Sequence, residues 1–353
     1  MEKILPLLNK LHTHHSLEKK EWCALLAQYG NETLRQAAAD MAQQITIERF
    51  GNGVFVRGIV EFSNYCVNDC LYCGIRRSNK KAERYRLNEK EILECCQAGF
   101  DYGFRTFVLQ SGEDRFWNCD KLCRLLREIK TSFPECAVTL SVGELSESEY
   151  QQLYDAGADR YLLRHESASP EHFSMIHPAQ QTLDSRMACL RVLKKIGFQT
   201  GCGFMVGTPG QTLEHLADDM AFISTFKPHM VGIGPFIPHC DTPFADHPSG
   251  SGEMTLLLLS LCRIMLPEVL LPATTALGTL LPGGRIKGIL AGANVIMPNI
   301  SPVEIRSKYS LYNNKNSADT GSAGVLHSEL QQQLAAVGRK IVIGRGDYGE
   351  RSC

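Results

Sequence analysis

The sequence predicts an α/β protein, a (β/α)8 TIM-type barrel with an N-terminal helical extension and a short C-terminal tail. From residue 53 onward, short runs rich in β-forming residues alternate with helical patterns. We count eight such units, the number that closes a barrel. No linker or shift in composition divides residues 53–300. We therefore expect the helical extension over residues 1–52, the barrel over 53–312 and the tail over 313–353.

Each expected unit begins with a short strand, and the first seven continue into a helix. The strands cover residues 54–62, 105–110, 137–142, 160–164, 200–206, 230–237, 270–276 and 293–297. The helical patterns cover residues 89–98, 119–130, 147–155, 185–196, 213–225, 254–265 and 285–290. Strands separated by helices run parallel, because parallel neighbours need crossover connections. An open, doubly wound sheet with an appended domain is the alternative to the barrel.

The two ends of the chain follow other patterns. Residues 1–50 read as helical, with apolar positions that include Leu7, Leu8 and Leu11. Residues 313–324 are rich in Asn, Ser and Gly, so we expect a loop or a partly disordered segment there. A short helix near residues 328–337 and a final piece rich in Arg and Gly follow.

The composition describes an ordinary globular protein of 353 residues, with 44% hydrophobic residues and a formal net charge of −1. This charge balance argues against nucleic acid or an anionic membrane as the main partner. The most apolar stretch, residues 256–271, is interrupted by Arg263, Pro267 and Glu268, and it is too short to span a bilayer. The chain shows no secretory signal, and its fourteen cysteines favour a reducing compartment such as the cytoplasm.

Three cysteines form an exceptional group directly after the first expected strand. Cys66, Cys70 and Cys73 have the spacing C-x3-C-x2-C. Three thiolates on one loop hold three irons of a cubane cluster, and without a nearby fourth cysteine the fourth iron stays open to a chelating ligand. A zinc site usually has four ligands from two separated pairs, and the nearest histidines are far away in sequence. We therefore expect the three cysteines to be the metal ligands and catalytic centre of one 4Fe–4S cluster.

The triplet also resembles the C-x3-C-x-aromatic-C signature of the radical S-adenosylmethionine (SAM) superfamily, with Tyr72 in the aromatic position. The resemblance implies that SAM chelates the open iron, that the reduced cluster cleaves it to a 5′-deoxyadenosyl radical, and that Tyr72 packs near the adenine. Gln110 and Ser111, after the second strand, resemble the superfamily's small-small-Glu segment, which meets the amino group of the cofactor. A plain turn, favoured by Gly112 and Asp114, is the alternative.

Charged side chains end the fourth expected strand. Strand alternation places Arg160, Arg164 and Glu166 on one face, and such charges are costly inside a barrel unless they bind a charged group. Glu166 would suit a ribose hydroxyl or the cofactor amine, whereas the arginines would suit a substrate carboxylate. The alternative is an ion pair on the rim. Arg186, at a helix start, would reach the cofactor carboxylate, with structural pairing as its alternative.

Two more strand ends offer side chains to the expected site. Met205, at the end of the fifth strand, would flank the adenine. Thr274 and Thr275, at the end of the seventh, provide two hydroxyls suited to an anionic or amino-acid substrate. Their alternative explanation is β-propensity alone.

Several segments together are similar to the HydE family, the radical SAM enzymes that help assemble the di-iron centre of FeFe-hydrogenase. The matching segments are residues 63–77, 84–86, 109–114, 160–166, 231–239, 272–276 and 294–299. The resemblance implies an iron-bound, cysteine-derived substrate and points to Thr139, Met230 and Tyr309 as cofactor or cavity residues. It also implies an electron donor such as ferredoxin or flavodoxin, and other hydrogenase maturases, as partners.

One departure from the family pattern affects the cluster count. Some members carry three additional C-terminal cysteines for an accessory cluster, whereas this chain has none between Cys262 and Cys353, so we expect a single cluster. Within the superfamily, a methylornithine synthase-like or biotin synthase-like enzyme is the alternative, and the latter would use Cys136 and Cys202 for a second cluster. A non-enzymatic iron–sulfur scaffold would form no 5′-deoxyadenosine.

Overall fold

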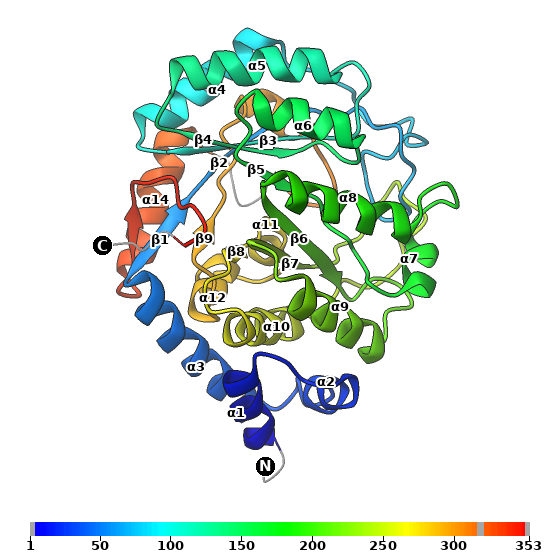
Figure 1. The fold of residues 1–353 in the computed structure, drawn as a ribbon, viewed down its shortest axis with the longest axis vertical. Helices are drawn as coiled ribbons and strands as arrows, with labels where there is room; N and C mark the ends of the chain where they lie inside the picture. Colours follow the sequence, from blue (N-terminus) through cyan, green and yellow to red (C-terminus); the bar gives the residue numbers. More distant parts are fainter. Residues whose placement is uncertain (1–3, 316–320, 350–353) are drawn as a thin grey trace.

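Parallel strands surround a central interior, and helices cover their outer faces (Figure 1). The structure is a computed structural model that describes residues 4–315 and 321–349. The strands are β1 (Gly53–Val56), β2 (Gly58–Ser63), β3 (Thr106–Ser111), β4 (Ala137–Ser141), β5 (Arg160–Leu162), β6 (Gln199–Val206), β7 (Met230–Pro235), β8 (Pro272–Ala273), β9 (Val295–Ile296) and β10 (Lys340–Val342). The predicted barrel architecture is confirmed.

The barrel wall consists of two sheets that meet at two seams. Strands β2 to β7 form one parallel sheet in chain order, and β1, β9 and β8 belong to the second. Isolated parallel bridges join the sheets between Ile59 and Asn299 and between Met230 and Leu270. The wall therefore closes, and the C-terminal ends of the strands meet at one mouth, where a barrel places its binding residues.

Two strands differ in extent from those expected. The first, predicted over residues 54–62, is divided at Arg57, because β1 pairs with β9 and β10 whereas β2 pairs with β3. Strand β8 has two residues in place of the predicted 270–276. Thr274 ends it by capping helix α11 (Thr275–Leu280), since its hydroxyl accepts a hydrogen bond from the Leu277 backbone N–H.

The outer helices follow the predicted order. They are α4 (Glu89–Asp101), α5 (Cys119–Ser132), α6 (Glu147–Asp155), α8 (Leu183–Ile196), α9 (Leu213–Phe226), α10 (Gly252–Met265) and α12 (Gly284–Leu290). Side-chain caps set the starts of all of these helices except α12; before α4, Asn88 and Glu91 exchange two hydrogen bonds in a capping box. The sequence did not predict α7 (Pro170–Ile176), α11 and α13 (Val303–Arg306), which are too short to show a helical period.

The N-terminal helices pack on the outside of the barrel. Helix α3 (Glu32–Phe50) contacts α10, and α2 (Lys19–Leu26) contacts α9, with α1 (Ile4–His14) beside them (Figure 1). Trp22 and Leu25 are fully buried and join the same apolar cluster as the barrel helices. Across the described residues, none of the helices combines the length and apolar character needed to cross a bilayer.

The C-terminal segment closes the far mouth of the barrel, at the N-terminal ends of the strands. After α14 (Ala323–Ala335), strand β10 pairs with β1, and the chain then crosses the interior. The Arg345 carbonyl accepts hydrogen bonds from the Thr106 hydroxyl and the Arg160 guanidinium. The last helix, predicted over residues 328–337, is α14 and begins earlier, at Ala323, within the segment predicted as a loop over residues 313–324. Residues 316–320 and Cys353 lie outside the described part.

Arg160 belongs to this closed mouth, which corrects its prediction as a substrate residue. It is the first residue of β5 and is fully buried, and it pairs with the Asp347 carboxylate at 2.6 Å. Strand alternation correctly predicts that Arg160 points into the barrel, but it does not indicate at which end of the barrel the residue lies. Its partner Asp347 could not be predicted either, because it lies far along the chain.

Removal of the Asp347 charge should destabilise the fold. The Asp347→Asn variant leaves the buried Arg160 without its carboxylate partner, so we expect the free energy of unfolding to fall by about 2 kcal/mol in urea titrations. The matched control is Glu83→Gln, which breaks an exposed pair with Lys308 and should change the same quantity by less than about 0.5 kcal/mol. Equal small effects would show that the closing segment contributes little to stability.

Candidate active site

Cys66, Cys70 and Cys73 line one cavity at the C-terminal mouth of the barrel, with a volume of about 270 Å³. The loop that carries them leaves β2 and is held against the end of β3. The Val67 N–H donates to the Glu113 carbonyl at 3.0 Å. Glycine is needed at position 112, because a Cβ there would lie 2.3 Å from the Tyr65 carbonyl oxygen. The close packing of the two strand ends therefore fixes the cysteine loop.

The three thiols occupy a buried site that favours their neutral form. Burial, followed by the charge of Cys66, raises the pKa of the Cys73 thiol to about 12. Burial also raises the pKa of Cys66, and Cys70 donates a weak hydrogen bond to the Gln181 side-chain oxygen at 3.2 Å. Thiolates in such a site require a bound cation to stabilise them. Within the described residues, the cavity lining includes no other cysteine and no histidine.

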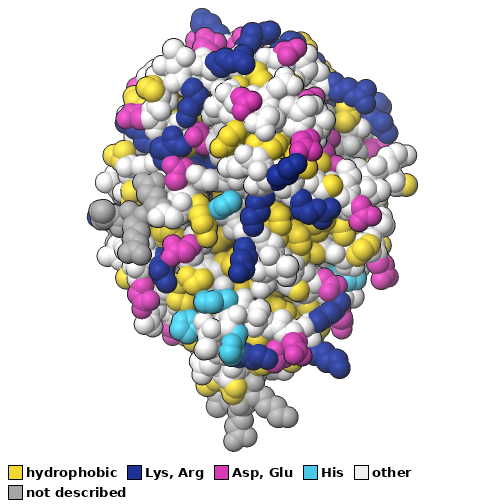
Figure 2. Space-filling view, in the orientation of Figure 1, with side chains coloured by type: hydrophobic (Ala, Val, Ile, Leu, Met, Phe, Trp, Pro, Cys, Tyr) yellow, Lys and Arg dark blue, Asp and Glu magenta, His cyan; other side chains and the backbone are white. Residues whose placement is uncertain are grey.

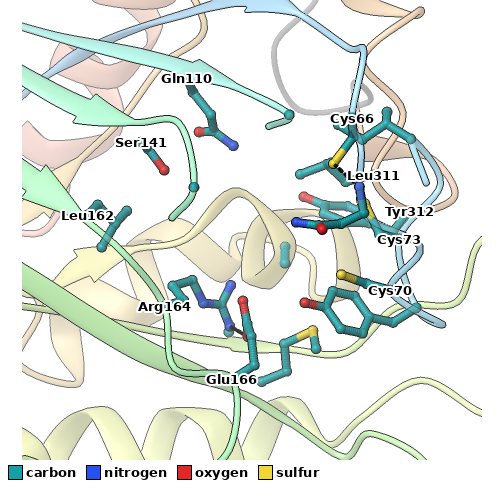
Figure 3. A pocket seen from close by; sticks show the side chains of 18 of the residues that line it. Cys66, Cys70, Cys73, Gln110, Ser141, Leu162, Arg164, Glu166, Leu311 and Tyr312 are labelled. Carbon is teal, nitrogen blue, oxygen red and sulfur yellow. Dashed lines mark hydrogen bonds and ion pairs between the residues drawn. The ribbon is translucent and has the colours of Figure 1, made fainter. Parts of the chain in front are cut away.

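This donor set fits an iron–sulfur cluster with one open iron. Three sulfur ligands suffice for three corners of a 4Fe–4S cubane, and the cavity continues beyond the cysteines toward polar groups on the strand ends. Figure 3 shows Cys66, Cys70 and Cys73 on one side, with Gln110, Ser141 and Arg164 across from them. A ligand that chelates the open iron would therefore extend into the barrel.

Arg164 and Glu166 form a buried charged pair whose hydrogen bonding is incomplete. Their side chains approach to 3.1 Å. This ion pair joins the Arg164 Nη2 atom to one carboxylate oxygen of Glu166, Oε2, and the Arg164 Nε atom has no hydrogen-bond partner among the described residues. Glu166 also has a φ of 62°, a left-handed conformation that non-glycine residues rarely adopt. Strain and unsatisfied polar atoms at one position are typical of a ligand site.

Arg186 is a buried, firmly anchored cation of the cavity lining. Its Nε donates to Glu144 at 2.6 Å, and its Nη1 donates to the Arg164 carbonyl at 2.5 Å. Burial alone lowers the pKa of Arg186, but the charge of Glu144 and the hydrogen bond to it outweigh burial and raise the pKa overall. Arg186 therefore stays charged while it holds the backbone just before Glu166.

The structure brings most of the predicted site residues together. Those that line the cavity are Cys66, Cys70, Tyr72, Cys73, Gln110, Ser111, Arg164, Glu166, Arg186, Met205, Thr274 and Tyr309. Tyr72 lies with its hydroxyl 3.2 Å from His177 Nε2, and its ring packs near Met205. The Thr274 hydroxyl faces the cavity and also caps α11, so part of its hydrogen-bonding capacity is already used.

Four predicted residues do not line this cavity. Arg160 lies at the closed mouth, and Met230 packs near it, with its sulfur 3.0 Å from Arg57. Thr139 precedes Ser141 by two positions on β4, so it lies one layer deeper. Thr275 is the first residue of α11 and is turned away from the lining. Their predicted places at this site are corrected accordingly.

Several lining residues were missed in the sequence. Ser141 ends β4, so the rule that strand ends build the site of a barrel could have found it. Glu113 lies in the segment that was singled out, yet its carboxylate was not assigned, and burial raises its pKa. Gln181 and Tyr312 come from irregular segments, which carry no periodic signal.

A network of buried polar residues supports the segment that carries Glu166. His165 Nε2 lies 3.3 Å from the Asp219 carboxylate, which also accepts a hydrogen bond from the Ala168 N–H at 2.6 Å. His172 bridges the hydroxyls of Ser167 and Thr208, each at 3.0 Å. These contacts fix the backbone on both sides of the strained residue.

His172 should make stability sensitive to acid. Burial lowers its pKa from 6.5 to about 4, so between these values the unfolded chain binds a proton that the folded chain does not. The free energy of unfolding is therefore lost as pH falls, by about 2 kcal/mol from pH 7 to pH 5 for this one group. In urea titrations, the free energy of unfolding of the His172→Gln variant should therefore fall by about 2 kcal/mol less than that of the wild type between pH 7 and pH 5. His12→Gln, on an exposed position of α1, is the control; matching losses in both variants would contradict the assignment.

Comparisons with known proteins agree with this geometry. A family model described as the radical SAM superfamily matches residues 60–223. The FeFe hydrogenase maturase subunit HydE of Thermotoga maritima is 46% identical over 280 residues, which cover 79% of this chain and 80% of that protein. The 3-methylornithine synthase of Methanosarcina barkeri is 29% identical over 83% of this chain and 79% of its own length.

Two solved structures share the fold. The crystal structure of methylornithine synthase has a TM-score of 0.82 at 23% identity, covering 95% of this chain and 97% of its own. The crystal structure of HydG, a maturase of the FeFe-hydrogenase, has a TM-score of 0.79 at 19% identity, covering 96% of this chain and 76% of its own. At these identities the likeness shows the fold alone.

Proposed function

Because the chain belongs to the HydE family of the radical SAM superfamily, we propose that it acts in assembly of the FeFe-hydrogenase H-cluster, on an iron-bound, cysteine-derived substrate. Membership makes the chain a radical SAM enzyme whose cofactors are a 4Fe–4S cluster and SAM. The bound, reduced cluster supplies one electron to SAM, whose C5′–S bond breaks to give methionine and a 5′-deoxyadenosyl radical.

The observation that carries this proposal is the cavity in which three cysteines face an unsatisfied Arg164–Glu166 pair. The cysteines supply the ligands of the cluster. The Glu166 carboxylate accepts from a ribose hydroxyl or from the amine of SAM, whereas Arg164, whose Nε atom has no hydrogen-bond partner among the described residues, binds a substrate carboxylate. Ligands with matching polar groups would complete the hydrogen bonding of this pair.

The remaining lining residues have roles that follow from their chemistry. Tyr72 packs against the apolar cluster that includes Met205 and Phe236, and the three residues line a part of the cavity suited to an adenine ring. Arg186 lies where it attracts the cofactor carboxylate, and Gln110 and Ser111 end β3 beside the cysteine loop, where they meet the cofactor amine. Thr274 and Tyr309 offer hydroxyls to ligands deeper in the cavity.

The function is tested by anaerobic reconstitution followed by iron counting and product analysis. We expect four irons per chain and 5′-deoxyadenosine formation that rises when iron–cysteine complexes are added. Stimulation by lysine would instead favour the methylornithine synthase-like alternative. Additional irons with sulfur insertion into dethiobiotin would favour the biotin synthase-like alternative. No 5′-deoxyadenosine at all would favour the scaffold.

Substitution of one cluster ligand should abolish the chemistry. In the Cys66→Ser variant we expect iron content to fall well below that of the wild type and 5′-deoxyadenosine formation to drop at least a hundredfold, because the hard hydroxyl is a poor iron ligand at this site. The matched control is Cys240→Ser, an exposed cysteine outside the cavity lining. Retained SAM cleavage in the Cys66 variant would refute the ligand assignment.

Substitution of Glu166 should weaken SAM binding without removing the cluster. Glu166→Gln keeps the size of the side chain but removes its charge, so we expect the KM for SAM to rise about tenfold, the loss of one charge-assisted hydrogen bond. Iron content should be unchanged. Glu171→Gln, exposed on α7, is the control. An unaltered KM in the Glu166 variant would remove this residue from the cofactor site.

A further inference from the structure

The loop that binds the cluster is also the most basic segment of the chain. Residues 76–86 contain six basic side chains and a single acidic one, Glu83, although the whole chain has a formal net charge of −1. In Figure 2, Lys and Arg side chains gather at the upper right, over the loop that follows β2. This asymmetry requires an explanation, because like charges on one short loop repel each other.

Of the six basic residues, Lys81 and Arg86 pair with Asp241 and Asp114 at 2.7 and 2.6 Å, and the other four divide into an inner and an outer set. The inner ones brace the loop: the Arg84 guanidinium donates to four backbone carbonyls, and Arg76 pairs with Asp69 at 2.7 Å. The outer ones, Arg77 and Lys80, are exposed, and the structure gives their side chains no ion pair with any residue of 4–315 or 321–349. The outer charges therefore contribute nothing evident to the fold.

Two exposed aromatic residues lie against Arg86, another basic residue of this loop, which pairs with Asp114 at 2.6 Å. Tyr65, immediately before Cys66, is 36% exposed and Phe116 is 48% exposed. The Arg86 guanidinium lies over both rings, at 3.7 Å from the Tyr65 centroid and 4.8 Å from that of Phe116. Arg115, next to Phe116, is exposed as well. Half-exposed rings surrounded by cations are typical of protein interfaces.

This surface is built on backbone that contacts the cysteine loop. The Arg76 N–H donates to the Cys73 carbonyl at 3.1 Å, and the Arg77 N–H donates to the Asn68 carbonyl at 2.8 Å. The outer side chains are thus attached to backbone that contacts the ligand loop directly. A redox protein bound here would lie against the cluster, whereas helices cover the other sides of the barrel.

We propose that the cluster-loop surface, made up of Tyr65, Arg77, Lys80, Arg86, Arg115 and Phe116, is the docking site for a small acidic one-electron carrier protein. The inference rests on the proposed function, because reductive SAM cleavage consumes one electron per event. Each event oxidises the carrier by one electron, which enters the cluster and then breaks the C5′–S bond of SAM. The cations steer the acidic partner, and the aromatic residues provide the contact area.

The test compares two reductants on the reconstituted holoenzyme. Flavodoxin reduced to its hydroquinone needs a docking site, whereas photoreduced deazaflavin is a small uncharged reductant that does not. In the Arg77→Glu/Lys80→Glu double variant, 5′-deoxyadenosine formation driven by subsaturating flavodoxin should fall about tenfold at low ionic strength. The rate with deazaflavin should remain within about twofold of the wild type. The wild-type rate with flavodoxin should also decrease steeply with added salt.

A matched control separates local from global charge. Lys20→Glu/Arg191→Glu makes the same change in net charge at two exposed residues, on α2 and α8, and should leave both rates unchanged. Equal flavodoxin-driven rates in the two double variants would overturn the docking surface. A wild-type enzyme that forms no 5′-deoxyadenosine with either reductant would instead overturn the proposed function, so the two failures are distinguishable.

Discussion

The structure depends on how charged groups are neutralised inside a closed barrel. Arg160 begins β5 and Arg164 follows two residues after its end, and both point inward, in an environment where an unpaired charge is strongly unfavourable. At the closed mouth the C-terminal segment of the chain supplies Asp347, whose carboxylate pairs with Arg160. At the open mouth Glu166 pairs with Arg164 at 3.1 Å, but the Arg164 Nε atom has no hydrogen-bond partner among the described residues. The charge at the closed mouth is thus paired within the protein, whereas the charges at the open mouth line the cavity where ligands bind.

The same constraint explains the strained backbone at Glu166. A left-handed residue persists only where its surroundings determine it, and here the supports come from three directions. Arg186 binds the carbonyl of Arg164, Asp219 binds the N–H of Ala168, and the Glu166 N–H itself donates to the Gly203 carbonyl at 3.0 Å. The carboxylate is therefore held in place before any ligand arrives, which reduces the entropy lost on binding.

The sequence could predict the barrel and the cluster loop because both depend on local patterns. Strand and helix periods alternate eight times, and the cysteine spacing lies within eight residues. The errors share a different cause. Alternation along β5 assigns a face to Arg160 and Arg164 alike, but only the tertiary structure shows that they lie at opposite mouths. Gln181 and the closing segment at Asp347 reach the barrel from loops, and no period marks such residues in advance.

The cavity that results is asymmetric, and its asymmetry follows from which strands carry which side chains. The ends of β3 to β5 contribute Gln110, Ser141 and Arg164, whereas β7 contributes Gly234, where a Cβ would lie 2.9 Å from the Thr274 hydroxyl. A larger residue there would displace Thr274 and fill the space beside it. The polar side chains at the ends of β3 to β5 orient a ligand through hydrogen bonds, whereas the glycine of β7 leaves space for it. SAM has a charged methionyl end and a flat, apolar adenine ring. The polar side chains of the cavity suit the first, and the apolar ones suit the second.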